Sequence, residues 1–215
     1  DSPYKQIAAD VNRSGTVTAY DLVQLRQLIL NVTTEFSNND SWRFVDKDFT
    51  FIDMYQPFPY DDEINVMASG EMNMANDFVA VKIGDVNNTV VVSLTDEALE
   101  KRSAYKLYYS LYGESAERKN LIPVFSDEAG LIYGFQFSLT IDGAQIKDIL
   151  PGSVNLDKSN FNLKDNGQTV VSWQSTSGAV TGKSIPLFYL DVTDIEDEKF
   201  ALSIIGDGPR PEVYV

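Results

Sequence analysis

The chain has 215 residues, of which 32 are acidic and 17 are basic, so its net charge is -15 at pH 7. An acidic surface of this kind repels phosphate groups, which disfavours nucleic acids and anionic membranes as partners. The sequence contains no cysteine and no histidine, which excludes disulfides, thiolate nucleophiles, Ser-His-Asp triads and His-ligated zinc. A bound metal would need oxygen ligands, which favours calcium or magnesium.

The first motif along the chain is DVNRSGTVTAYD, residues 10–21. Twelve-residue calcium loops place their ligands at positions 1, 3, 5, 7, 9 and 12, with glycine at position 6. Gly15 is at position 6 here. The predicted ligands are the side chains of Asp10, Asn12, Ser14 and Asp21, the carbonyl oxygen of Thr16, and a water near Thr18. Only two of them are anionic, so we expect modest, micromolar to millimolar affinity for Ca²⁺. The alternative is a turn rich in Asp and Asn that caps a helix.

A helix is predicted at residues 20–30, because Leu22, Leu25, Leu28 and Ile29 recur at three- and four-residue spacing. Asn31 is a plausible end of this helix. Residues 31–76 are rich in Asn, Asp, Phe and Pro and show little periodicity, so we expect an irregular insert. Its aromatic residues are expected to pack against the predicted helix: Trp42, Phe44, Phe49 and Phe51. The segment DFVAVKIGDVNN follows as a second short apolar element.

The second half of the chain alternates with period two. In FQFSLTID, the side chains of Phe135, Phe137, Leu139 and Ile141 are predicted to share one face. Further strands are expected at 105–111, 121–125, 145–150, 169–174, 185–192 and 200–205, separated by turn signals. Short strands without intervening helices indicate an antiparallel β-sandwich. We therefore predict a mainly β protein with a small α part, divided into domains 1–90 and 91–215.

The stretch DVNRSGTVTAYDLVQLRQLIL resembles the first repeat of a dockerin, a calcium-binding module that carries two loop-helix repeats. The resemblance implies a second, weaker metal site at Asp85, Asn87 and Thr89, where Val90 replaces the position-6 glycine. It also implies a partner interface at loop positions 10 and 11, which are Ala19 and Tyr20.

Residues from about 100 to 215 resemble a cohesin-like domain, through GLIYGFQFSLTIDGAQIKDILPGS and VVSWQSTSGAVTGKSIPLFYLDV. This resemblance implies a jelly-roll-type antiparallel sandwich. Several tyrosines are clustered near its start, and they either stack on sugars or pack against protein. They are Tyr105, Tyr108, Tyr109 and Tyr112.

These features together predict a non-catalytic, calcium-stabilised structural or adhesive module. We expect it to be a mature protein or a fragment of a larger bacterial surface protein, located outside the cell. The expected partner is a cohesin-like domain, in cis or in a neighbouring copy. The alternative is a carbohydrate-binding accessory module of a secreted polysaccharide-degrading enzyme. Acid pairs such as Asp61 and Asp62 are interpreted as solvated loop residues, because no hydrophobic pocket signal surrounds them. No apolar run approaches the roughly 20 residues of a membrane span.

Overall fold

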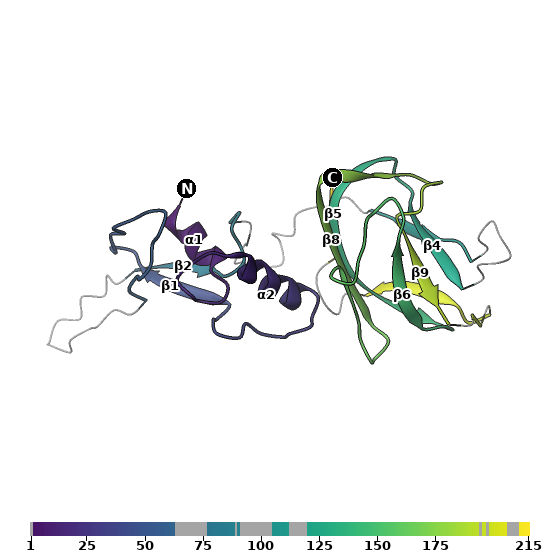
Figure 1. The fold of residues 1–215 in the computed structure, drawn as a ribbon, viewed down its shortest axis with the longest axis horizontal. Coiled ribbons are helices and arrows are strands. Elements are labelled where there is room, and N and C mark those ends of the chain that lie inside the picture. The colour runs from purple at the N-terminus through teal and green to yellow at the C-terminus, as the bar shows by residue number, and fades with distance from the viewer. Residues whose placement is uncertain are drawn as a thin grey trace. The chain divides into compact units, whose positions relative to one another are not determined.

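The structure is a computed structural model, and it describes residues 2–62, 77–88, 90, 105–111, 120–193, 195, 196, 198–205 and 211–215. The chain divides into two compact units. The first comprises residues 1–28 and 33–100, and the second comprises residues 29–32 and 101–215. The described part is mainly β, with two short helices and antiparallel sheets, as the sequence predicts at this level (Figure 1).

Two helices flank the predicted calcium loop. Helix α1 is Pro3–Ala9 and begins with a proline, whose fixed φ suits the first helical turn. Helix α2 is Ala19–Ile29, within one residue of the prediction, and Asn31 follows it with a left-handed φ of 59°. Helix α1 was not predicted, because seven residues are too few to establish a 3.6-residue period.

The first unit also contains a two-stranded antiparallel sheet, β1 (Trp42–Asp46) and β2 (Phe78–Lys82), with Phe44 opposite Ala80. The prediction that residues 31–76 are irregular was wrong at β1. The alternation of hydrophobic and polar residues expected of a strand is missing from the β1 sequence. The strand buries Arg43 together with Val45, while Phe44 is 51% exposed. A charged residue on the inner face breaks the alternation that period-two analysis detects.

The core of the first unit is small. Ile7 and Ala8 of α1 pack with Val45 and Val81 of the sheet, and Phe49, Phe51 and other aromatic residues surround them. The rings of Tyr4 and Phe51 meet edge to face at 5.6 Å. Phe49 and Phe51 therefore pack around α1, and the predicted packing of these aromatics against the later helix is corrected.

The second unit is a β-sandwich-like pair of antiparallel sheets (Figure 1). One sheet has the order β3-β4-β9-β6. The other has the order β10-β5-β8-β7, and β11 also pairs with β5. The strands are β3 (Leu107–Tyr109), β4 (Leu121–Ser126), β5 (Gly130–Asp142), β6 (Ile146–Pro151), β7 (Phe161–Leu163), β8 (Thr169–Thr181), β9 (Phe188–Val192), β10 (Ala201–Ile205) and β11 (Glu212–Tyr214).

One hydrophobic core joins the two sheets of this unit. Phe135, Phe137 and Leu139 of β5 are buried, as the alternation predicts. The ring of Phe135 lies 5.6 Å from Trp173 of β8 and 6.1 Å from Phe188 of β9. The core thus takes aromatic side chains from both sheets, and Trp173 is a core residue.

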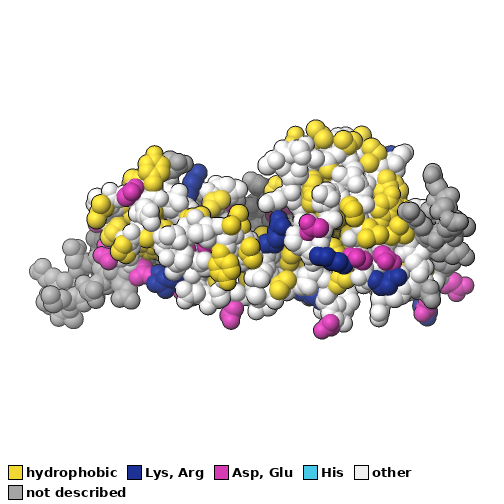
Figure 2. Space-filling model, viewed as in Figure 1, with side chains coloured by type: hydrophobic (Ala, Val, Ile, Leu, Met, Phe, Trp, Pro, Cys, Tyr) yellow, Lys and Arg dark blue, Asp and Glu magenta, His cyan; other side chains and the backbone are white. Residues whose placement is uncertain are grey.

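Both units also keep hydrophobic side chains at their surfaces, drawn in yellow in Figure 2. Neither described helix is long and apolar enough to cross a membrane.

Candidate calcium site

Asp10 occupies position 1 of the loop and lies directly after α1. Its side chain is buried, and the backbone folds around it. Oδ1 accepts a hydrogen bond from the Ser14 amide at 2.9 Å, and Oδ2 accepts one from the Gly15 amide at 2.8 Å. Gly15 has φ 79°, a conformation that glycine adopts without steric cost. The glycine at position 6 therefore lets the chain wrap around the Asp10 carboxylate.

Asp21 occupies position 12, in the first turn of α2, and is also buried. Its Oδ2 accepts hydrogen bonds from the Thr18 amide at 2.8 Å and the Thr18 hydroxyl at 3.1 Å. Its Oδ1 accepts one from the Asn12 amide at 3.1 Å. The first two bonds form a capping arrangement at the start of α2, and the third closes the loop. Asp21 thus joins the helix start to the other end of the loop.

The neutral predicted ligands lie in the same hydrogen-bonded loop. The Ser14 hydroxyl is 3.4 Å from Asp10 Oδ1 and donates to the Thr16 carbonyl at 3.0 Å. Asn12 Oδ1 is buried and accepts no hydrogen bond from any residue that the structure describes. A buried carbonyl oxygen without a donor is costly, and a cation would satisfy it.

This donor set fits a calcium ion of modest affinity. Among the described residues, no three Asp, Glu, His or Cys side chains gather as a metal-holding group. The loop would instead combine two carboxylates with the neutral oxygens of Asn12, Ser14 and Thr16. Calcium accepts such mixed oxygen ligands, and fewer charged ligands give weaker binding.

The second predicted loop is described in part. Asp85 Oδ2 accepts a hydrogen bond from the Val90 amide at 2.9 Å. This bond between positions 1 and 6 corresponds to the bond from the Gly15 amide to Asp10 Oδ2 in the first loop. Asn88 at position 4 has φ 59°, close to the 55° of Arg13 at position 4 of the first loop. Asn87 is exposed. Thr89 lies outside the described residues.

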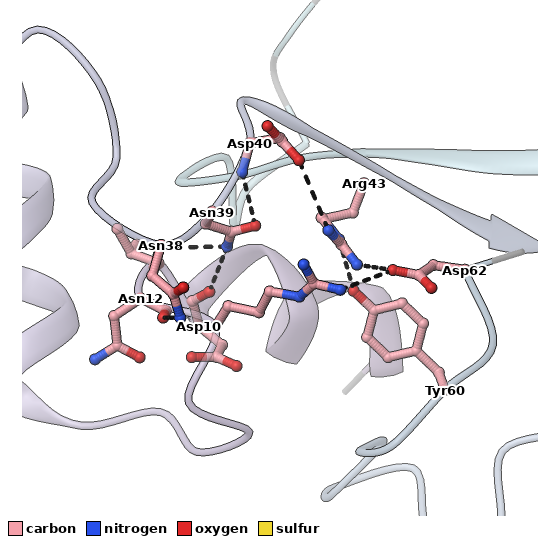
Figure 3. A network of polar contacts seen from close by, with 10 residues as sticks. Asp10, Asn12, Asn38, Asn39, Asp40, Arg43, Tyr60 and Asp62 are labelled. Carbon is pink, nitrogen blue, oxygen red and sulfur yellow. Dashed lines mark hydrogen bonds and ion pairs between the residues drawn. The ribbon is translucent and has the colours of Figure 1, made fainter.

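The insert contacts the first loop, which sequence reasoning missed (Figure 3). Asn38 and Asn39 donate to loop carbonyls, and Asp62 pairs with both Arg13 and Arg43. Asp62 is therefore an ion-pair partner, and its interpretation as a solvated loop acid is corrected. In the sequence, the run NND at 38–40 indicates only a polar loop. Its hydrogen-bond acceptors in the first loop lie 26 to 29 residues earlier, so no local pattern predicts these contacts.

A cavity of about 410 Å³ lies where the loop and the insert meet. Asp10, Ser14 and Gly15 line it from the loop, and Phe58 and Tyr60 line it from the insert. The loop 10–21 and the insert therefore form one local structure rather than two independent segments.

The other predicted surface residues are not among the candidate metal ligands. Ala19 and Tyr20 are exposed at the start of α2, where Tyr20 is 59% exposed. In the sandwich, Tyr108 stacks on Phe125 at 5.2 Å, and Tyr109 meets Phe200 edge to face at 5.4 Å. These tyrosine rings pack within their own unit. Tyr112 lies outside the described residues.

Comparison of the chain with protein-family models, curated proteins and solved structures gives no match.

Proposed function

We propose that this chain is a non-catalytic, calcium-stabilised extracellular module that mediates protein-protein assembly in a larger bacterial surface protein. The observation that carries the proposal is the loop 10–21. It buries two carboxylates, Asp10 and Asp21, and leaves the buried Asn12 Oδ1 without a hydrogen-bond donor among the described residues. A calcium ion would neutralise the carboxylates and satisfy that oxygen.

Calcium would be held by Asp10, Asn12, Ser14, the Thr16 carbonyl and Asp21. The ion's role is structural, because these ligands connect the end of α1 to the first turn of α2. Binding only to the folded state stabilises that state by mass action, by about 2.7 kcal/mol when calcium exceeds its Kd a hundredfold.

The assembly role rests on the exposed start of α2, in a dockerin-like loop-helix unit. Ala19 and Tyr20 stand at the recognition positions that the resemblance implies, and Leu22 and Val23 beside them are 68% and 50% exposed. Exposed apolar side chains that are grouped on a protein surface, rather than scattered singly, are typical of a protein interface. The proposed partner is a cohesin-like sandwich, in this chain or in a neighbouring copy.

The calcium role is tested by thermal unfolding with millimolar calcium or with excess chelator. We expect calcium to raise the Tm by several degrees, because about 1 kcal/mol shifts a small domain by roughly 4–8 °C. Asp10→Ala and Asp21→Ala should abolish the shift. Glu35→Ala is the matched control, since it removes an exposed negative charge from the same unit. Equal melting with calcium and chelator in the wild-type chain would refute the calcium role.

The assembly role is tested by sedimentation of the whole chain with calcium, and of residues 1–90 mixed with residues 100–215. We expect self-association or binding between the pieces that Tyr20→Ser weakens. If the whole chain is monomeric and the two pieces do not bind each other, the partner proposal is contradicted. The proposed calcium site would not be affected by that result.

A further inference from the structure

The insert binds three consecutive carbonyl groups of the calcium loop. Asn39 Nδ2 donates to the Asp10 carbonyl at 3.0 Å and to the Val11 carbonyl at 3.2 Å. Asn38 Nδ2 donates to the Asn12 carbonyl at 3.1 Å. Asn39 Oδ1 in turn accepts from the Asp40 amide at 3.0 Å, which orients the Asn39 amide group. Loop positions 1 to 3 are therefore fixed from outside, through their backbone.

A second contact fixes loop position 4. Arg13, with its left-handed φ of 55°, donates to Asp62 Oδ2 at 3.0 Å. Arg43 of β1 pairs with the same oxygen, and its Nε donates to the Tyr60 hydroxyl at 3.3 Å. Arg43 is only 7% exposed, so its guanidinium is a fixed partner that holds Asp62 in place. Figure 3 shows Asn38 and Asn39 next to Asp10 and Asn12 of the loop, and Asp62 next to Arg43 and Tyr60.

These contacts act on the backbone that carries the metal ligands. Asn38, Asn39 and Asp62 are not themselves predicted ligands, so their effect on calcium must pass through the loop conformation. If the loop backbone became ordered only when the ion binds, the conformational entropy lost on ordering would weaken the affinity. A loop with two charged ligands attracts calcium less strongly than a loop with more acidic ligands. Its calcium affinity therefore depends more on how well the loop is ordered before the ion binds.

We propose that Asn39 and Asp62 are positioning residues for calcium, which hold loop residues 10–15 in the binding conformation before the ion arrives. The insert is then a functional part of the metal site rather than a tolerated loop. This inference rests on the proposed calcium role, and it adds residues that contact the loop from outside its twelve positions.

The test is calorimetric titration of calcium into the whole chain carrying Asn39→Leu, which keeps a similar shape and removes both donated hydrogen bonds. We expect the calcium Kd to rise about tenfold, because two modest hydrogen bonds to the loop are lost. Asn39→Gln keeps the amide donor and should recover part of the affinity. Asp62→Asn, at a partly exposed site, should raise the Kd several-fold. Lys47→Ala is the control, because it breaks an exposed ion pair with Asp77 in the same unit without touching the loop.

A second measurement separates positioning from general stability. In excess chelator, amide hydrogen exchange at Ser14 and Gly15 should be faster in Asn39→Leu than in the wild type and the Lys47→Ala control. Should Asn39→Leu unfold in chelator, Asp62→Asn provides both readouts. The positioning role would be overturned if the Asn39 and Asp62 variants bound calcium with the same Kd as the wild type and showed the same rate of amide hydrogen exchange. Absence of calcium binding by the wild-type chain would instead overturn the proposed calcium role.

Discussion

Leu25 of α2 packs against Gly84, so closely that a β-carbon built on Gly84 would lie 2.9 Å from Leu25 Cδ1. Gly84 has φ 88° and donates its amide hydrogen to the Ala8 carbonyl at 2.8 Å. This glycine therefore meets residues from both helices just before the second loop. The contact explains how a short amphipathic helix is held, since isolated helices of this length are marginal in water.

Gly84→Ala should destabilise the first unit by about 1–3 kcal/mol, from the left-handed backbone and the displacement of Leu25. Gly167→Ala is the matched control, because Gly167 has φ 83° but, apart from its chain neighbours, no described residue has an atom within 4 Å of the position that an alanine methyl group would take there. Urea unfolding measures both. Leu25→Ala combined with Gly84→Ala should cost less than the sum of the single changes. If Gly84→Ala lowers the free energy of unfolding no more than Gly167→Ala does, the contact with Leu25 does not contribute to stability.

Val90→Gly should let the second loop bind calcium more tightly. The hydrogen bond from the Val90 amide to Asp85 repeats the one from Gly15 to Asp10, so the first half of that loop already has the required connection. Glycine at this position can adopt a positive φ like the 79° of Gly15 at position 6, although it should lower stability by roughly 0.5–1 kcal/mol. Calorimetry should show an added weak binding step that Val90→Ala lacks. If the glycine variant titrates like the wild-type chain, the second loop is a turn and not a latent site.

The sandwich strands were predictable because burial there follows period two. Phe135, Phe137 and Leu139 alternate along β5, and the structure buries all three. The prediction ended β8 at Gln174, whereas the strand continues to Thr181 through a polar stretch that contains Gly178. Such residues look like a turn in sequence. In the structure, residues 175–178 fall in a register shift, and Gly178 has a left-handed φ of 73°, while Gln174 and Ala179 on either side pair with β5. Tertiary pairing overrides local propensity in this case.

The candidate loop residues could be selected from sequence because their spacing is local, whereas the residues that contact the loop from the insert could not. Asp10 and Asp21 belong to one twelve-residue motif. Asn39 and Asp62 reach the same loop only because β1 and the aromatic cluster of Phe49, Phe51 and Phe58 fold the insert back onto α1. No pattern within the insert specifies that return. Contacts across tens of residues depend on the packed unit and cannot be read from spacing.

Phe188→Ala should destabilise the second unit by about 3–5 kcal/mol, because a fully buried ring is replaced by a cavity. The Phe188 ring contacts Phe135 and Phe137 of the opposite sheet, with centroids 6.1 Å and 6.3 Å away. Leu131→Ala, at a residue that is 48% exposed, should change stability by about 0.5 kcal/mol or less. Chemical unfolding followed by tryptophan fluorescence reports on both. Similar costs for the two variants would contradict the assignment of Phe188 to a shared core.

The pair of Lys158 and Asp148 should contribute a pH-dependent stability to the second unit. Lys158 Nζ lies 2.5 Å from Asp148 Oδ1, and this hydrogen bond is the main reason that the pKa of Asp148 is lowered below its ordinary value of 3.8. The Ile149 amide also donates to this carboxylate at 2.8 Å and lowers its pKa further, while partial burial opposes the shift. Because the folded pKa is below the unfolded one, the stabilisation is complete above about pH 3.8 and is lost as the pH falls through the folded pKa.

Lys158→Met should therefore move the pKa of Asp148 upward, and the variant should be less stable than the wild type near neutral pH but not in strong acid. Carboxyl-carbon NMR titration measures the pKa, and unfolding at several pH values measures the stability difference. Lys106→Met removes an exposed positive charge from the same unit and should leave the Asp148 titration unchanged. Since Lys158 is largely exposed, high salt should weaken the effect. An Asp148 pKa that stays the same after loss of Lys158 would show that the Ile149 amide alone lowers it.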